Sequence, residues 1–204
     1  NILIGSGKNI QSPLELAGFV LKSLNIDLEE IKRISGFSAK RKTLSYLIRR
    51  AEENGIYVGK TISYHRIDVE NMRGLFIAND FAPFIVLNRA DALSAQIFSF
   101  VHELAHFFRK SESISNSIDF RDSNKEVNPE ERFCNRVAAE LLLPRSAFIN
   151  EYYDKNDIER IAEEYKMSNI FVFYRLKDLG KIRQAQTNNL ENQILKETKE
   201  NILK

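Results

Sequence analysis

The stretch that decides how this chain folds is residues 98–108, which read Phe98-Ser99-Phe100-Val101-His102-Glu103-Leu104-Ala105-His106-Phe107-Phe108. Its apolar spacing predicts a helix over about residues 92–110. Residues four apart lie on one face of a helix, so His102 and His106 can point at one ion. Glu103 lies about 100° further around the axis, where it can accept a proton from a water beside that ion. The stretch therefore predicts a zinc site on a buried helix.

A third protein ligand is needed, because zinc in hydrolases usually has three protein ligands and one open position. The residues after His106 lack the Gly and the further His of the metzincin extension. Only one other histidine exists, His65, and it lies upstream on a predicted strand. The ligand must then come from the acidic residues downstream, which are Glu112, Glu126, Glu130, Glu131 and Glu140.

A second helix, which we expect to begin at Pro129, favours Glu131 among these candidates. Glu131 and Asn135 are four residues apart and share a face of small residues suited to close packing. Glu140 lies about 180° and Glu130 about 100° from Glu131 around the axis. Asn135 would then hold a ligand histidine by its second ring nitrogen. One alternative stays open, because acids favour the positive end of a helix whatever their role.

The rest of the sequence predicts an α+β fold. We expect residues 1–11 to be a linker, residues 111–128 to be a surface loop, and two or three short helices between 144 and 179. Helices are also predicted near residues 12–24, 27–35 and 39–54. Short apolar runs predict strands at residues 56–58, 61–64, 74–78 and 84–87, the last two as a hairpin. The sequence therefore predicts three parts of the chain: a helical segment at 1–55, a catalytic domain at 56–180, and a polar tail or helix at 181–204.

The composition is that of a globular protein, with 204 residues of which 43% are hydrophobic and 28% charged. A net charge of +2 gives no overall attraction to nucleic acid or an anionic membrane. The single cysteine, Cys134, excludes an internal disulfide and favours a reducing compartment, so we expect a cytoplasmic protein. No apolar run is long enough to predict a membrane span. The chain begins with Asn1 rather than Met, and we expect a trimmed molecule.

Two motifs together resemble the ImmA/IrrE family of zinc metallopeptidases. The first is H-E-L-A-H at residues 102–106, and the second is E-R-F-C-N-R-V-A-A-E-L-L-L-P at residues 131–144. The family's second motif has the form E-x-x-A-N-x-F-A-A-E-L-L-x-P, so Cys134 and Val137 here are changes in packing that leave the ligands in place. The resemblance covers about residues 56–180.

This resemblance implies a zincin-like fold, in which a small, mostly antiparallel sheet packs on the H-E-x-x-H helix. It implies one Zn²⁺ per chain held by His102, His106 and Glu131, with Glu103 as the catalytic base. Characterised members are intracellular peptidases that act on helix-turn-helix repressors, in mobile elements or in stress responses. The implied function is thus a zinc-dependent endopeptidase in which a metal-activated water attacks a peptide bond of a transcriptional repressor.

Two further expectations concern what the protein binds. An extended substrate would pair with an exposed strand edge, and Tyr64 and His65 are weak candidates for an oxyanion donor. Residues 158–180 have the outline of a DNA-binding helix-turn-helix, but the apolar run at 170–174 suits a core, which argues against direct DNA binding. The alternative function is a zinc-containing regulator that binds DNA or a repressor and has little peptidase activity.

Overall fold

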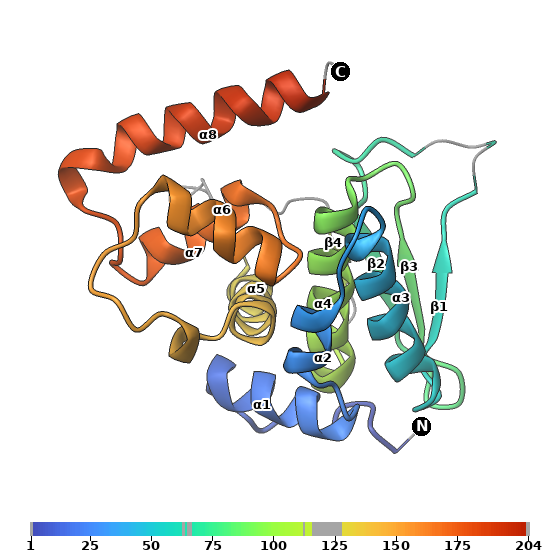
Figure 1. Ribbon diagram of the computed structural model, residues 1–204. Helices are drawn as coiled ribbons and strands as arrows, with labels where there is room; N and C mark the ends of the chain where they lie inside the picture. Colours follow the sequence, from blue (N-terminus) through green and yellow to red (C-terminus); the bar gives the residue numbers. More distant parts are fainter. Residues whose placement is uncertain (1, 63, 65–66, 112, 116–127, 203–204) are drawn as a thin grey trace. The chain divides into compact units, whose positions relative to one another are not determined.

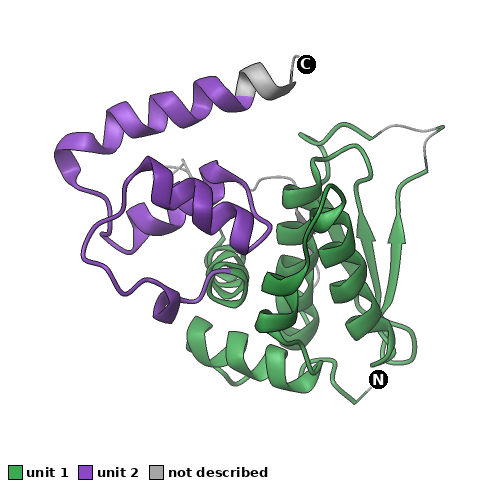
Figure 2. Cartoon of the chain, viewed as in Figure 1, with its two compact units in different colours: residues 1–142 green, residues 143–204 purple. Residues whose placement is uncertain are grey.

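A computed structural model of the chain describes residues 2–62, 64, 67–111, 113–115 and 128–202. Its secondary structure is α+β, as the sequence predicts (Figure 1). The chain forms two compact units, residues 1–142 and residues 143–204 (Figure 2). Among the helices in the described ranges, none has the length and apolar character needed to cross a membrane.

The three predicted N-terminal helices are present in the first unit. They are α1 (Pro13–Ser23), α2 (Leu28–Arg33) and α3 (Ala39–Glu52). The hydroxyl of Ser12 accepts a hydrogen bond from the backbone N–H of Glu15 at the start of α1, and the carboxylate of Asp27 accepts one from Glu29 at the start of α2. These side chains satisfy N–H groups that a helix leaves unpaired in its first turn.

A small mixed sheet lies beside these helices in the first unit. The described strands are β1 (Tyr57–Lys60), β2 (Gly74–Ile77), β3 (Phe84–Leu87) and β4 (Ser113–Ser115), in the spatial order β1-β3-β2-β4. β2 and β3 pair antiparallel, which confirms the predicted hairpin, and β4 is also antiparallel to β2. β1 and β3 are parallel.

One predicted strand is absent among the residues that the structure describes, and one strand lies where a loop was predicted. Residues 61–64 do not form a strand in their described part: the N–H of Thr61 still bonds to the carbonyl of Leu87, but Tyr64 lies in a turn and is 91% exposed. The region predicted as a surface loop contains β4, whose backbone pairs with β2. Pairing with a free sheet edge makes a strand of Ser-Ile-Ser without the apolar alternation that would have signalled it.

Helix α4 (Leu93–Arg109) forms the centre of the first unit. Every residue from Gln96 to Phe108 is buried. The helix contacts β2, β3 and β4 of the sheet, and also α1, α3 and α5 (Pro129–Leu142). A helix that is apolar all round is stable only when other elements cover all its faces, and here they do.

The first residues of the chain are not a free linker. The backbone N–H of Gly5 bonds to the carbonyl of Phe107 at 3.0 Å, and that of Gly7 bonds to the carbonyl of Phe108 at 2.9 Å. Residues 2–9 form turns that use carbonyls at the C-terminal end of α4, which have no partner within the helix. The two glycines that suggested a linker instead allow this close backbone approach.

The second unit is helical. It contains α6 (Lys155–Glu164), α7 (Asn169–Asp178) and α8 (Thr187–Ile202), with short 3₁₀ turns at Arg145–Ala147 and Gln184–Gln186. A capping box between Asp154 and Asp157 begins α6. The C-terminal segment, predicted as a polar tail or helix, is a helix that contacts α7.

Candidate metal centre

Helix α4 places two imidazole rings one turn apart and almost completely buried. His102 is 3% exposed and His106 is 1% exposed. Their Nε2 atoms are 3.0 Å apart, and the rings meet at an interplanar angle of 65°. Two ring nitrogens this close either share a proton or face a common partner, because a buried polar atom without a partner is costly.

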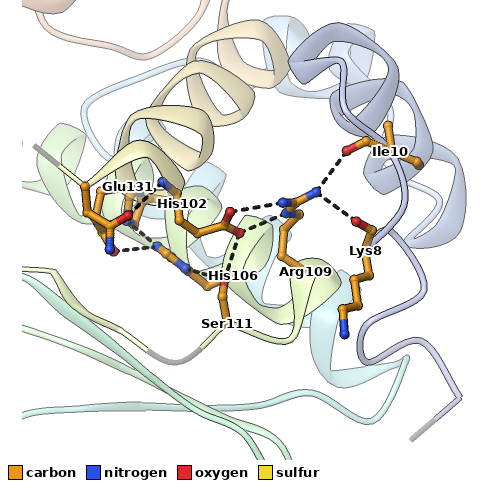
Figure 3. Close-up of polar contacts among 9 residues, drawn as sticks. Lys8, Ile10, His102, His106, Arg109, Ser111 and Glu131 are labelled. Carbon is orange, nitrogen blue, oxygen red and sulfur yellow. Dashed lines mark hydrogen bonds and ion pairs between the residues drawn. The ribbon is translucent and has the colours of Figure 1, made fainter.

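Helix α5 packs against α4 and brings a carboxylate to the same point. Oε2 of Glu131 lies 3.2 Å from Nε2 of His102, and Oε1 lies 3.2 Å from Nε2 of His106 (Figure 3). The two ring nitrogens and the carboxylate all lie within 4.8 Å of one another. Of the acidic candidates that the structure describes, Glu131 is the one that lies beside the histidines.

These donors fit a metal ion. Ligand atoms at about 2.0–2.1 Å from a tetrahedral zinc lie roughly 3.3 Å from one another. Here the two ring nitrogens are 3.0 Å apart, and each lies 3.2 Å from a different oxygen of the Glu131 carboxylate. Neutral imidazole nitrogen and carboxylate oxygen are also donors that zinc accepts. The three residues could therefore hold a metal ion and leave a position open.

The carboxyl of Glu131 is held in its charged form. Burial raises its pKa, but hydrogen bonding and electrostatic attraction from His102 and His106 outweigh that and lower the pKa to about 2. The group is thus a carboxylate at neutral pH, the form that coordinates a cation.

Glu103 lies on another side of α4, outside this group of three. Its side chain is fully buried and rests against Gly74, the first residue of β2. A Cβ atom at position 74 would lie 2.7 Å from Oε1 of Glu103. Gly74 was not predicted as part of the site. Its one signal in the sequence is a glycine at the start of an apolar strand, where the backbone and another group often approach closely.

Asn135 is half-buried on α5, and the described hydrogen bonds do not join it to either histidine. Nδ1 of His106 is instead 2.9 Å from Oγ of Ser111. Nδ1 of His102 is buried and has no hydrogen-bond partner among the described residues. The role assigned to Asn135 stays a prediction.

The other candidates lie elsewhere. Glu130 faces Arg109, which lowers the pKa of its carboxyl by hydrogen bonding. Glu140 is buried further along α5. Tyr64 is exposed in its turn, and the remaining candidates, His65, Glu112 and Glu126, lie outside the described residues.

The helix pair α6–α7 offers few exposed side chains that could contact DNA bases. Residues 171–176, most of α7, are buried. Arg175 is 5% exposed and its Nε donates to the backbone carbonyl of Leu143, and Lys177 pairs with Glu191 of α8. A recognition helix instead needs several side chains free to reach base edges.

Comparison with known proteins gives one clear relationship. No curated protein matches the chain. The model of the IrrE N-terminal-like domain, Peptidase_M78, matches residues 57–177, which is more than half of the chain and includes α4 and α5. A His–His–Glu group within that match agrees with a metal-dependent peptidase. The chain therefore belongs to the Peptidase_M78 family, which supports a hydrolase activity of the peptidase type and a protein substrate.

Proposed function

We propose that this protein is a zinc-dependent endopeptidase with a zincin-like fold. His102, His106 and Glu131 would hold one zinc ion, and Glu103 would act as the catalytic base. The observation that carries this proposal is that the two buried Nε2 atoms lie 3.0 Å apart and each lies 3.2 Å from an oxygen of the partly exposed Glu131 carboxylate, on two packed helices. The family match to a peptidase supports the same conclusion.

The chemistry divides between the ion and the protein. When bound, zinc would supply Lewis acidity, which lowers the pKa of a water molecule and polarises a peptide carbonyl. Glu103 accepts the proton of the attacking water on its carboxylate and then delivers it to the nitrogen of the leaving amine. Glu103 is buried, and burial strengthens the electrostatic interactions of its carboxylate, because charges act more strongly in a medium of low dielectric constant.

The substrate is proposed to be a transcriptional repressor of the helix-turn-helix kind, cut at a specific site in the cytoplasm. The resemblance of the two metal-site motifs to the ImmA/IrrE family supports this assignment. The single cysteine, Cys134, is consistent with a reducing compartment. An extended segment of the substrate would pair with an edge of the sheet by backbone hydrogen bonds.

The test replaces the proposed base. Glu103→Gln keeps the size of the side chain but removes its basicity, so hydrolysis should fall by about 10²–10⁴-fold while zinc content is unchanged. Glu52→Gln, at an exposed position of α3, is the matched control and should behave as the wild type. Cleavage is read from new peptide termini, by mass spectrometry of a proteome-derived peptide library.

Two outcomes would change the proposal. Wild-type cleavage rates in zinc-loaded Glu103→Gln would contradict the role of Glu103. A wild-type protein that binds zinc but produces no new termini would favour the alternative, a zinc-containing regulator that acts by binding.

A further inference from the structure

A line of hydrogen bonds leads from His106 away from the metal centre. Nδ1 of His106 is 2.9 Å from Oγ of Ser111, and that hydroxyl donates to Oε1 of Glu130 at 3.1 Å. Arg109 donates to both oxygens of the same carboxylate, from Nε at 2.8 Å and from Nη2 at 3.0 Å. The line thus joins the end of α4, the second residue after it, and the first turn of α5.

The direction of each bond in this line is fixed by chemistry. A guanidinium only donates, and a carboxylate only accepts. The hydroxyl of Ser111 must therefore give its single proton to Glu130, which leaves Oγ as an acceptor toward His106. Nδ1 of His106 must then be the donor and carry a ring proton. Any proton that Nε2 shares with the Glu131 carboxylate in the metal-free protein is the one that a cation would replace, so Nε2 is the nitrogen left to bind a metal ion.

Nε2 is the nitrogen that faces Glu131 and His102 (Figure 3). A metal ion binds the nitrogen that carries no proton, and the bond made by the other nitrogen decides which one that is. We infer that Ser111, Glu130 and Arg109 are positioning residues, which hold His106 in the tautomer and orientation that bind the metal. This inference rests on the proposed metal site.

The backbone at the end of α4 explains how Ser111 reaches the ring. Lys110 adopts a left-handed conformation with φ of 54°, which turns the chain back at the end of the helix. The N–H of Ser111 then bonds to the carbonyl of His106 at 3.1 Å. The same turn that ends the helix therefore places the Ser111 hydroxyl beside Nδ1.

Arg109 is anchored at its other end as well. Its Nη1 donates to the carbonyls of Lys8 and Ile10, each at 3.0 Å (Figure 3). Its guanidinium carbon also lies 4.6 Å from the centre of the Phe133 ring on α5. An arginine held by the N-terminal segment, by Glu130 and by an aromatic ring has little freedom, so it fixes the Glu130 carboxylate.

The first test measures zinc affinity by competition with a chelator. Ser111→Ala removes the acceptor for Nδ1 and should weaken zinc binding about 10–100-fold, the usual effect of losing the partner of a ligand histidine. Ser111→Thr keeps a hydroxyl and should stay within about threefold of the wild type. Ser45→Ala, exposed on α3, is the control for loss of a serine hydroxyl. Circular dichroism of each variant verifies folding.

The second test reads the tautomer without metal or activity. In metal-free wild type at pH 8, ¹⁵N spectra of the histidine side chains should show His106 protonated on Nδ1, and Ser111→Ala should shift this ring toward a mixture of tautomers. His106→Gln identifies its signals. A ring whose Nδ1 carries no proton in the wild type would overturn the inference.

The two proposals fail differently. Zinc affinity of Ser111→Ala equal to that of the wild type would overturn the positioning role and leave the proposed peptidase intact. A wild-type protein that binds no zinc would overturn the metal site, and with it this inference. Restored affinity in Ser111→Thr beside a loss in Ser111→Ala supports the hydroxyl itself as the cause, rather than a change in packing.

Discussion

At the level of single residues, the three candidate site residues of α4, His102, Glu103 and His106, have different surroundings. His106 has a hydroxyl at its second nitrogen, whereas Nδ1 of His102 has no hydrogen-bond partner within the described residues. Glu103 is buried against the backbone of β2 at Gly74. The spacing of the motif predicts which residues share a face of the helix, but these neighbours come from other parts of the chain.

Gly74 is predicted to set the position of Glu103. In Gly74→Ala the new methyl group would lie 2.7 Å from Oε1 of Glu103, so the carboxylate must move. We expect kcat to fall at least about tenfold with KM and zinc content little changed, and the free energy of unfolding to fall by about 1–3 kcal/mol. Steady-state kinetics and denaturant unfolding measure both effects.

The control for this substitution is Gly18→Ala in α1. A Cβ there has no atom within 4 Å, and alanine favours a helix more than glycine does. This variant should keep full activity and gain up to about 1 kcal/mol of stability. A fully active Gly74→Ala protein would show that Glu103 does not depend on this contact.

Cys134 is predicted to be unreactive in the folded protein. Burial raises the pKa of its thiol, and the nearby carboxylates of Glu130 and Glu131 raise it further. The thiolate is the reactive form, so a chromogenic disulfide reagent at pH 8 should label almost no protein until denaturant is added. Rapid labelling of the folded protein would mean that α5 opens at this position.

At the level of elements, three segments differ from what their composition indicates. Residues 2–9 bond to the end of α4, Ser113–Ser115 pairs with β2, and α8 packs on α7. Each gains its structure from a partner distant in sequence, which local patterning does not report. The N-terminal helices, α4 and α5 were predicted, because caps and a long 3.6-residue period are local signals.

Helix α8 is predicted to contribute to the stability of the second unit. Leu190 is 8% exposed and Ile194 is 1% exposed, one turn apart on a helix that contacts α7. Ile194→Ala should lower the free energy of unfolding by about 2–4 kcal/mol, the usual cost of such a cavity. Gln193→Ala, at an exposed neighbouring position, should change it by less than about 0.5 kcal/mol.

Chemical denaturation followed by circular dichroism compares these two α8 variants. Equal stability of both variants would mean that the helix is not packed in solution.

At the level of the whole molecule, the candidate site belongs to one compact unit. The three metal-capable residues lie on α4 and α5, within residues 1–142. The α+β class could be predicted from the helical periods and the short apolar runs. The meeting of the three residues could be predicted from the two motifs, because helix geometry and the family resemblance point to the same residues. The division of the chain at residues 55 and 180 remains a prediction.

The residues that contact the candidate site residues from other parts of the chain could not be predicted. Ser111 and Gly74 reach it through a turn after α4 and through the approach of β2, and both depend on tertiary contacts. A serine in a polar run and a glycine before a strand look ordinary in the sequence. Their roles become visible only when the hydrogen bonds and distances are known.

The central claim is that His102, His106 and Glu131 bind zinc together, and its most direct test is the zinc content of the purified protein. Elemental analysis after zinc loading at neutral pH should find about one zinc per chain in the wild type and far less in Glu131→Ala. Glu52→Ala, exposed on α3, should keep the full amount. Full zinc in Glu131→Ala, or none in the wild type, would contradict the account.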